Sequence, residues 1–269
     1  MNLPSVSVIL PAYNCEKFIG KAIQSVLQQT LSDFELIIVN DGSTDNTESI
    51  IHEFNDPRIV YQKNRENKGL INSLNTAISM AKGKYTARMD ADDICLLERL
   101  SKQKAFLDQN ENITAVASTI EFINDREEKI GIWELDRQTI TPGQIKKALL
   151  RQNCIAHPTV VIRSEMIKLL KYKEYQKNIE DYDLWLRLLN RGLKIAKLEE
   201  PLLLYRVHDT SITSLHLKTS NPFFKHLVMK MKFLIHFRHI SWFAVSVFGS
   251  AIMDLIRGFF KAIKNIFGK

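Results

Sequence analysis

The first ninety residues alternate short β-branched runs with amphipathic helical segments, and few folds accept this order. Strand-like runs are predicted at residues 6–10, 36–39, 59–61 and 84–87. The segments between them carry apolar residues at helical spacing. Such alternation is typical of an α/β fold with a mostly parallel sheet flanked by helices. Sheets of this kind bind ligands at the carboxyl ends of their strands.

Polar residues follow three of the predicted strands directly. Asn14, Asp41 and Asp90 each lie just past a strand end, so we expect them at one edge of the sheet. A dehydrogenase is disfavoured, because the first strand-to-helix turn lacks G-x-G-x-x-G, and no Walker A motif occurs. Residues 41–52 are not an EF-hand loop, since the twelfth position is His52 rather than Glu.

An acidic motif follows the fourth predicted strand. Residues 88–93 read Arg-Met-Asp-Ala-Asp-Asp, which crowds three carboxylates into four positions. Because like charges repel, such a cluster needs a cation or hydrogen-bond donors. Mg²⁺ is usually held by one or two carboxylates plus phosphates, so the motif predicts a nucleoside-diphosphate site. The alternative is that Asp92 or Asp93 caps a helix beginning near Leu96.

Composition indicates an ordinary globular chain. Its 269 residues, 45% of them hydrophobic, suffice for one large α/β domain with an appendage. The three cysteines are far apart and form no C-x-x-C pair, which is typical of a reduced, cytosolic protein. The N-terminus does not resemble a secretory signal, and no uncharged run reaches the roughly 20 residues that span a bilayer. The α/β domain is therefore expected in the cytoplasm.

The net charge of +7 is concentrated in residues 223–269, which hold eight lysines and arginines against Asp254. Because this excess accompanies apolar and aromatic residues, it favours an anionic membrane surface as partner and disfavours nucleic acid. Residues 240–253 are uncharged but too short to span a bilayer, and 255–269 read as an interfacial amphipathic helix. We expect a basic, membrane-associating helical tail at the inner face of the plasma membrane. For 223–237, a helix packed on the catalytic domain is an equal alternative.

Several motifs together resemble the family 2 glycosyltransferases. They are Ser-Val-Ile-Leu-Pro-Ala-Tyr-Asn at 7–14, Val-Asn-Asp-Gly-Ser-Thr-Asp at 39–45, Asn-Lys-Gly at 67–69, Met-Asp-Ala-Asp-Asp at 89–93 and Glu-Arg-Leu at 98–100. The resemblance covers roughly the first 210 residues. It implies a Rossmann-like GT-A fold, a nucleotide-diphospho-sugar donor and inversion at the transferred sugar. We expect a catalytic domain at 1–222, with a nucleotide-binding half at 1–110 and an acceptor-binding half at 111–222.

The resemblance also implies roles for single residues of the first half. Pro11 and Tyr13 would lie against the nucleoside, and Asp41 would bind the base, commonly uracil. Asp90 would contact ribose or the donor sugar, and Asp92 would bind the Mn²⁺ or Mg²⁺ that bridges the diphosphate. A UDP-sugar is the expected donor. The plainer alternatives are packing for Tyr13 and turn formation for Asp41. Asp45, by contrast, is interpreted as a helix N-cap.

A second acidic motif, Ile-Glu-Asp-Tyr-Asp at 179–183, resembles the family's Glu-Asp motif at a helix start. There Asp181 would take the proton from the acceptor hydroxyl, as an inverting displacement requires. Simple helix capping is the alternative, and Asp183 is expected to be a solvated neighbour. His157 falls where the acceptor side of such sites lies, and its role stays open.

The remaining candidates are a histidine and two arginines. His208 follows the last predicted strand and resembles the family's C-terminal histidine, which is often a metal ligand. Arg88 and Arg99 could pair with phosphate or with the aspartates, and the pattern leaves both options open.

The resemblance predicts a metal-dependent enzyme that transfers one sugar at a time. The Gln-x-x-Arg-Trp motif of processive synthases is absent, and the nearest analogue is Leu-Trp-Leu-Arg at 184–187. We expect a saccharide acceptor, lipid-linked, in cell-surface polysaccharide biosynthesis. Two alternatives remain. One is a nucleotidyltransferase, which would normally carry a Gly-rich basic loop after its first strand. The other is a non-catalytic membrane scaffold, which would keep the fold and only bind nucleotide.

Overall fold

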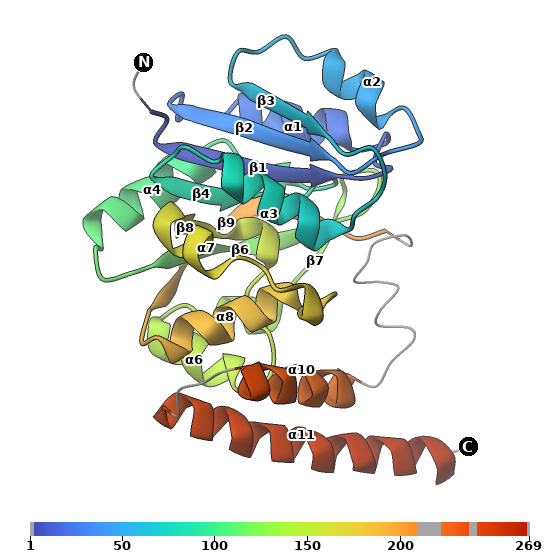
Figure 1. Ribbon diagram of the computed structural model, residues 1–269, viewed down its shortest axis with the longest axis vertical. Coiled ribbons are helices and arrows are strands. Elements are labelled where there is room, and N and C mark those ends of the chain that lie inside the picture. The colour runs from blue at the N-terminus through green and yellow to red at the C-terminus, as the bar shows by residue number, and fades with distance from the viewer. Residues whose placement is uncertain (1–2, 209–221, 237–240, 268–269) are drawn as a thin grey trace.

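A computed structural model describes residues 3–208, 222–236 and 241–267, and its first half contains the predicted alternation (Figure 1). The elements are β1 (Val6–Ala12), α1 (Ile19–Leu27), β2 (Phe34–Asn40), α2 (Thr47–His52), β3 (Ile59–Lys63), α3 (Leu70–Met80) and β4 (Tyr85–Arg88). The four strands are parallel and lie in the order β3-β2-β1-β4. The predicted parallel sheet is therefore confirmed for this half.

The second half extends the same sheet with mixed pairing. Its elements are β5 (Ile94–Cys95), α4 (Arg99–Gln109), β6 (Ala115–Ile123), β7 (Lys129–Ile132), α5 (Glu134–Gln138), α6 (Pro142–Leu149), η1 (His157–Thr159), β8 (Val161–Arg163), α7 (Ser164–Leu170), η2 (Glu174–Gln176), α8 (Glu180–Asn190) and β9 (Ile195–Arg206). Strand β8 lies antiparallel between β4 and β6, and β9 is parallel to β6. The result is a nine-stranded α/β sheet in the order β3-β2-β1-β4-β8-β6-β9-β5, with β7 paired to β6.

Apolar side chains of the strands fill two layers, one on each face of the sheet. In β1, Ile9 packs with α3, α7 and α8, whereas Val8 and Leu10 pack with α1 and α4. This division follows from the strand geometry, because successive side chains point to opposite faces. Every residue of β1 and β2 is buried, and both strands are apolar except for Ser7, Glu35 and the terminal Asn40.

The acidic motif does not cap a helix, so that alternative is wrong. Helix α4 begins at Arg99, with Glu98 at its N-cap, rather than near Leu96. The short strand β5 follows Asp93 and pairs antiparallel with β9. The three aspartates therefore lie in a turn between two strands. Asp45 is also not the N-cap, since Asn46 occupies that position, although Asp45 Oδ1 accepts a hydrogen bond from the Thr47 amide at 3.0 Å.

The tail forms two helices stacked below α8, namely α10 (Pro222–His236) and α11 (Trp242–Phe267) (Figure 1). Residues 240–253 and 255–269 were expected as separate segments, but 242–267 form one continuous helix. Among the described residues, 242–261 are the one stretch long and apolar enough to cross a membrane. The uncharged run at 240–253, which was judged too short to span a bilayer, is therefore only part of a longer helix.

Helix α10 packs on the catalytic domain, as one of the two alternatives for 223–237 predicted. Met229 and Phe233 are buried in the same core cluster as Trp185 of α8. The Gln176 side-chain amide donates a hydrogen bond to the Met229 carbonyl at 3.2 Å, and the Lys232 ammonium donates to the Tyr175 carbonyl at 2.9 Å. The tail helix is thus held by both apolar and polar contacts.

A buried ion pair joins the two tail helices. Lys230 Nζ of α10 lies 2.5 Å from Asp254 Oδ2 of α11, and both side chains are fully buried. The same ammonium donates to Ser250 Oγ at 2.8 Å and to the Leu150 carbonyl at 2.9 Å, just past α6. A buried charge pair is stable only when its remaining hydrogen-bonding groups are satisfied, and these contacts do so. Helix α11 is therefore fastened at its middle to α10 and to the catalytic domain.

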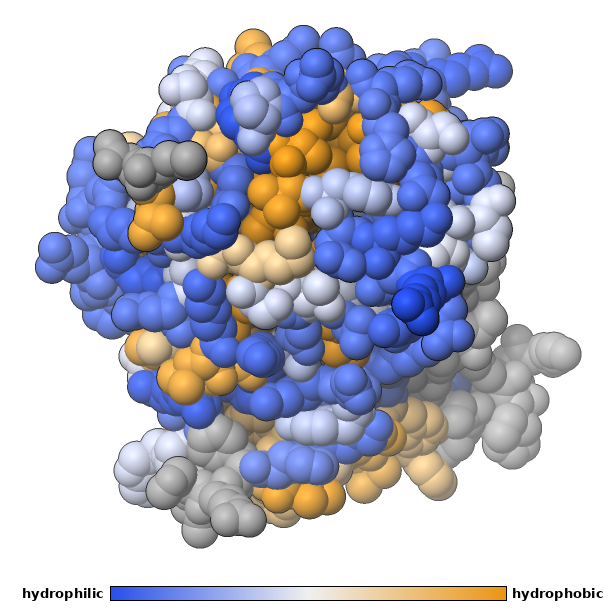
Figure 2. Space-filling model, turned by 45° about the horizontal axis from the view of Figure 1, so that its top comes forward, coloured by the Kyte–Doolittle hydropathy of each residue, from blue (hydrophilic) through white to orange (hydrophobic). Residues whose placement is uncertain are grey.

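Helix α11 is apolar on both faces, but only one face is covered. Phe243, Val247 and Ala251 are buried inward, together with Asp254. The outward stripe includes Trp242, Val245, Phe248, Leu255, Phe259 and Phe260. Trp242 is 89% exposed and Phe260 is 69% exposed. Figure 2 shows apolar side chains gathered along the lower edge of the molecule, where α10 and α11 lie.

Candidate active site

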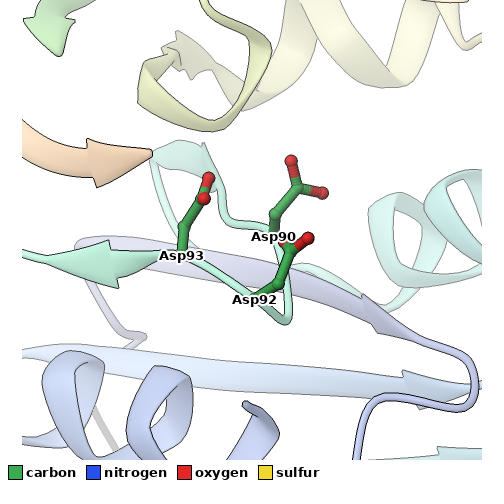
Figure 3. Close-up of side chains that lie close together, drawn as sticks. All are labelled: Asp90, Asp92 and Asp93. Atoms are coloured by element: carbon green, nitrogen blue, oxygen red, sulfur yellow. The ribbon is translucent and has the colours of Figure 1, made fainter. Parts of the chain in front are cut away.

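The turn after β4 brings three carboxyl groups together at the carboxyl edge of the parallel strands. One oxygen each from Asp90, Asp92 and Asp93 lies within 4.8 Å of the others. Figure 3 shows the three side chains pointing to the same side of the turn. Mutual repulsion and burial raise the pKa of Asp90 and hold that of Asp93 well above its usual range, with burial as the larger cause. A cation would relieve both effects.

His208 joins this cluster from the end of β9. Its Nε2 lies 2.9 Å from Asp92 Oδ2, although 116 residues separate the two in the chain. The hydrogen bond to Asp92 raises the pKa of His208. The two residues expected to bind the metal are thus adjacent, and carboxylate oxygens with an imidazole nitrogen form a donor set that fits a divalent ion.

Asp93 is a third acidic neighbour that the sequence interpretation left without a role. It is buried, and its Oδ1 accepts a hydrogen bond from the Arg206 amide at 2.8 Å. Its Oδ2 is buried and has no hydrogen-bond partner within the described residues. A buried carboxylate oxygen without a partner is costly, and an ion beside it would remove that cost. This orphaned atom supports a cation site.

The two undecided arginines have different partners. The buried Arg88 forms an ion pair with Asp90, and its Nε has no hydrogen-bond partner in the part of the chain that the structure describes. Arg99 does not contact the aspartates; its Nη2 donates to the Arg88 carbonyl at 2.7 Å and its Nε to Gln103 at 3.0 Å. Arg88 is therefore a residue of the site, and Arg99 supports the backbone that carries it.

The expected nucleoside-side residues lie past β1 and β2. Pro11 is buried within β1, and Tyr13 is 46% exposed just past it, so packing does not account for Tyr13. The Asp41 carboxylate accepts hydrogen bonds from Asn64 Nδ2 at 2.7 Å and from the amides of Lys68 and Gly69 at 3.0 and 2.8 Å. Asp41 thus anchors the loop over 64–69, and its contact with a base stays a prediction.

Asp181 lies in the first turn of α8, beside Asn153. Asn153 Nδ2 donates a hydrogen bond to Asp181 Oδ2 at 2.7 Å, and the Tyr182 amide donates to Oδ1 at 2.7 Å. Burial raises the pKa of Asp181, and these two donors oppose it. Burial and the neighbouring Asp181 raise the pKa of Glu180 to about 7. A carboxylate with a raised pKa and room to accept a proton suits a general base.

The expectation for Asp183 was wrong. Asp183 is fully buried rather than solvated, and its Oδ2 forms an ion pair with Arg187 Nε at 2.7 Å. Gln176 Nε2 donates to its other oxygen at 3.2 Å. Acid and arginine stand four residues apart on α8, a spacing at which helix side chains meet. The pair fixes the helix that carries Asp181.

His157, whose role was open, contacts Tyr172. Its Nε2 lies 2.6 Å from the tyrosine hydroxyl, and its ring packs edge-on against Trp185 at 6.0 Å. Burial, together with the positive charge of Arg88, holds the pKa of His157 well below its usual range. His157 is therefore neutral near pH 7, which allows it to exchange a hydrogen bond with the tyrosine.

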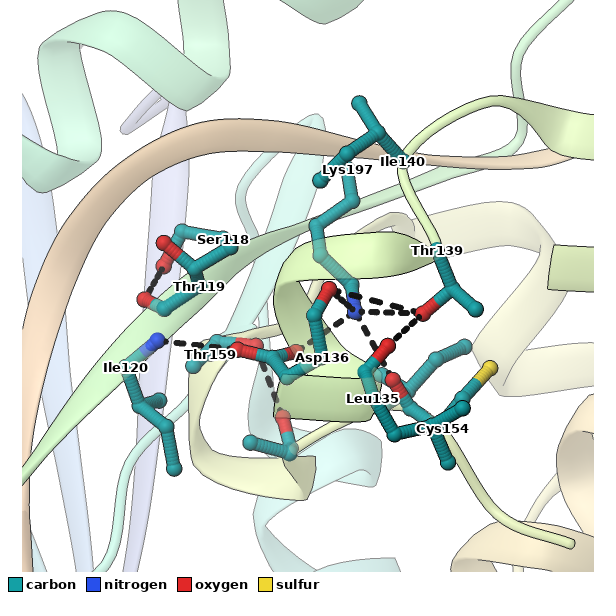
Figure 4. Close-up of polar contacts among 12 residues, drawn as sticks. Ser118, Thr119, Ile120, Leu135, Asp136, Thr139, Ile140, Cys154, Thr159 and Lys197 are labelled. Atoms are coloured by element: carbon teal, nitrogen blue, oxygen red, sulfur yellow. Dashed lines mark hydrogen bonds and ion pairs between the residues drawn. The ribbon is translucent and has the colours of Figure 1, made fainter. Parts of the chain in front are cut away.

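A buried lysine network supports the loop that precedes His157 (Figure 4). Lys197 Nζ of β9 lies 2.5 Å from Asp136 Oδ1 and donates to the Cys154 carbonyl at 2.7 Å. Asp136 Oδ2 accepts the Ile120 amide of β6 at 3.0 Å. Since Cys154 is next to Asn153, this network positions the side chain that contacts Asp181.

The site therefore unites residues that lie far apart in the chain. Asp92 and His208 are in contact, and Asp181 raises the pKa of Asp90 by its charge, which places the second acidic motif within electrostatic range of the first. The sequence interpretation missed Asn153 and Tyr172, because no local pattern marks a loop residue whose partner lies elsewhere in the chain. Arg88 could have been recognised from the sequence, because it is the first residue of the acidic motif at 88–93.

Comparisons with known proteins identify related chains. The chain is 32% identical over 210 residues to the Escherichia coli UDP-Glc:alpha-D-GlcNAc-diphosphoundecaprenol beta-1,3-glucosyltransferase WfaP, covering 78% of this chain and 80% of that protein. It is 36% identical over 215 residues to the E. coli O-antigen biosynthesis glycosyltransferase WbnJ, covering 78% and 82%.

Solved structures share the fold at low sequence identity. Staphylococcus aureus TarS in complex with UDP-GlcNAc superposes with a TM-score of 0.73 at 20% identity, over 94% of this chain and 72% of that one. The mannosyltransferase PcManGT of Pyrobaculum calidifontis, in complex with GDP-Man and Mn²⁺, gives 0.66 at 15% identity, over 100% and 77%. The fold is therefore of the GT-A type. The model of glycosyl transferase family 2 matches residues 7–169, and the chain belongs to that family.

Proposed function

We propose that the protein transfers one sugar, with inversion, from a UDP-sugar to a lipid-linked saccharide in cell-surface polysaccharide biosynthesis. This proposal rests on the contact between Asp92 and His208 within the acidic cluster. The same cluster lies within electrostatic range of Asp181. Family membership supports transfer over the nucleotidyltransferase and scaffold alternatives. The WfaP and WfgD relatives are named for a UDP-Glc donor and a diphosphoundecaprenol-linked acceptor, which favours these substrate classes.

On the donor side, Asp92 and His208 would hold a divalent ion, with Asp90 and Asp93 beside them. Such an ion neutralises the charge that develops on the leaving nucleoside diphosphate. The imidazole favours Mn²⁺ over Mg²⁺, which prefers oxygen ligands. Tyr13 is exposed at the end of β1 and available to stack on the nucleoside.

On the acceptor side, Asp181 takes the proton from the attacking hydroxyl. Asn153 fixes the orientation of the carboxylate through Oδ2. The raised pKa of Asp181 brings its basicity closer to neutral pH, where a general base is most effective. Arg88 forms an ion pair with Asp90, and its positive charge lowers the pKa of Asp181.

We further propose that α11 docks on an anionic membrane surface. An apolar stripe that includes Phe248, Phe259 and Phe260 is exposed, and contiguous apolar patches of this kind mark interaction or membrane sites. Exposed Arg257 and Lys261 of the same helix can meet anionic headgroups, at about 1 kcal/mol each. Such a location at the inner face of the plasma membrane would bring the site to a lipid-linked acceptor.

The helix is long enough to cross a bilayer, but the ion pair favours docking in the plane of the membrane. Crossing would separate Asp254 from Lys230 or carry both into hydrocarbon. An aspartate at the centre of a bilayer costs about 3 kcal/mol or more. A helix held at its middle, with one apolar face free, is the geometry of an interfacial helix.

A donor screen tests the proposal. We expect a UDP-sugar to raise the melting temperature in the presence of Mn²⁺ and not in EDTA, because only a ligand of the folded state stabilises it. Asp92→Asn should abolish the increase, whereas Asp33→Asn, which changes an exposed aspartate in the loop between α1 and β2, should preserve it. Product from a GlcNAc-diphospho-lipid should carry the inverted anomeric centre by NMR. Full transfer in EDTA, or retention of configuration, would refute the proposal.

A further inference from the structure

The first turn of α10 is fixed beside the carboxylates of α8. The His226 ring packs edge-on against Tyr182, with ring centroids 5.5 Å apart, and Tyr182 directly follows Asp181. Tyr182 in turn donates its hydroxyl hydrogen to the Leu149 carbonyl at 2.6 Å. The tail therefore contributes side chains next to the proposed base, although it lies outside the region matched by the family model.

Lys225 is the charged residue of this turn. It is half-buried, and within the described residues it forms no ion pair or hydrogen bond. Burial lowers its pKa, and the negative charges of Glu180 and Asp181 oppose that change, which places the ammonium within electrostatic range of both. Lys230 and Lys232 of the same helix, by contrast, have polar partners. Lys225 is thus a positive group next to the base that remains available for a ligand.

The position of Lys225 is also tied to α11. Gly258 of α11 packs so closely on Phe224 that an added Cβ would lie 2.7 Å from the Phe224 ring. Phe224 precedes Lys225 and His226 follows it, so the residues on either side of the lysine contact α11 and α8. A substrate that reaches from the apolar stripe to Asp181 would pass this position.

We propose that Lys225 binds the diphosphate of a lipid-linked acceptor and so selects diphosphate-linked saccharides over neutral glycosides. This inference rests on the proposed function. In such an acceptor a short saccharide separates the attacked hydroxyl from the phosphates, and the lipid follows them. The attacked hydroxyl would then lie at Asp181, the diphosphate at Lys225 and the lipid on the apolar face of α11. Ammonium-to-phosphate hydrogen bonds are charge-assisted and among the stronger ones.

Direct binding tests this assignment without a donor. Two probes with the same short prenyl chain are titrated calorimetrically into full-length protein in detergent, one carrying GlcNAc through a diphosphate and one carrying it directly. We expect Lys225→Met to weaken binding of the diphosphate probe about 10- to 100-fold, as expected for loss of a hydrogen bond to a charged group. Binding of the neutral probe should not change, and Lys225→Arg should restore most of the affinity.

The control is Lys168→Met, which removes the same charge from an exposed position of α7. It should leave the affinity for both probes unchanged. Equal losses for both probes in Lys225→Met would indicate a structural role, and no loss for either would show that the lysine does not contact the acceptor. Either result overturns the assignment. Failure of the proposed function would differ, because no UDP-sugar would then be transferred whatever the two probes bind.

Discussion

At the scale of residues, the proposed base is a half-buried carboxylate whose pKa is set by neighbouring protein groups. Burial raises the pKa of Asp181, while Asn153 and the Tyr182 amide stabilise its ionised form. Because a base must be deprotonated to accept a proton, we expect activity to fall as the pH drops below this pKa. Groups that donate to Asp181 should therefore extend activity to lower pH.

Asn153→Ala should move the acid limb of the pH–rate profile to higher pH. Loss of the hydrogen bond removes a group that favours the charged form, so the pKa of Asp181 rises further. The measurement is kcat/KM against pH at saturating Mn²⁺. Gln152→Ala, an exposed neighbour, should leave the profile unchanged. If the acid limb of Asn153→Ala did not move, or moved to lower pH, this account of the base would be contradicted.

Sequence patterns predicted part of this site because some residues lie in runs with recognisable spacing. Asp90 and Asp92 follow a strand directly, and His208 follows another, so the shared edge of the sheet brings them together. Asn153 and Tyr172 lie in irregular segments, and their partners are set by tertiary packing alone. The ion pair of Asp183 with Arg187 was open to prediction from their i, i+4 spacing, but its burial was not.

At the scale of elements, a buried ion pair holds an irregular segment of the second half of the sheet domain. Lys197 of β9 and Asp136 of α5 are both fully buried, and Lys197 also binds the Cys154 carbonyl. Burial raises the pKa of Asp136, and the lysine opposes that effect. The loop with Asn153 therefore depends on a charge pair about which the sequence analysis made no prediction.

Lys197→Met should destabilise the fold by about 3–5 kcal/mol, because it leaves Asp136 buried without its cation. Urea unfolding at pH 7, followed by circular dichroism, measures this loss. The double variant Lys197→Met with Asp136→Leu should recover much of it, since an apolar pair of similar size carries no buried charge. A single variant as stable as the wild type would show that the pair contributes little.

The alternation of strands and helices predicted the parallel half of the sheet, with bounds close to those observed. It could not predict that β8 lies antiparallel between β4 and β6, because β8 has only three residues and its neighbours are remote in sequence. The single helix α11 was also missed. Asp254 divides the apolar run as read along the sequence, but in the structure it faces inward to Lys230.

At the scale of the whole molecule, the catalytic domain lies above a tail whose outer face is apolar and basic. The first 222 residues are neutral, and the tail carries the whole net charge of +7. We therefore expect electrostatic attraction to anionic lipid to act on the side opposite the parallel strands β1–β4 (Figure 1). This arrangement orients the protein with α11 on the membrane.

The variant Phe248→Glu with Phe260→Glu should lose binding to anionic liposomes while keeping donor-dependent melting, because both side chains are exposed and distant from the donor site. Co-sedimentation at low and high salt measures this, and high salt should partly release the wild type. The matched control is Ile130→Glu with Leu169→Glu, which changes exposed apolar residues of β7 and α7. If the control lost binding equally, net charge alone would explain the attachment.

The central claim is that Asp181 is the base that activates the acceptor. It is tested by comparing wild type and Asp181→Asn for donor affinity and for transfer in a single turnover, with Mn²⁺ and a GlcNAc-diphospho-lipid. We predict that donor affinity stays within about twofold while transfer falls 10²- to 10⁴-fold, the usual contribution of a general base. An Asp181→Asn protein that binds donor poorly but transfers at the normal rate once saturated would contradict the account.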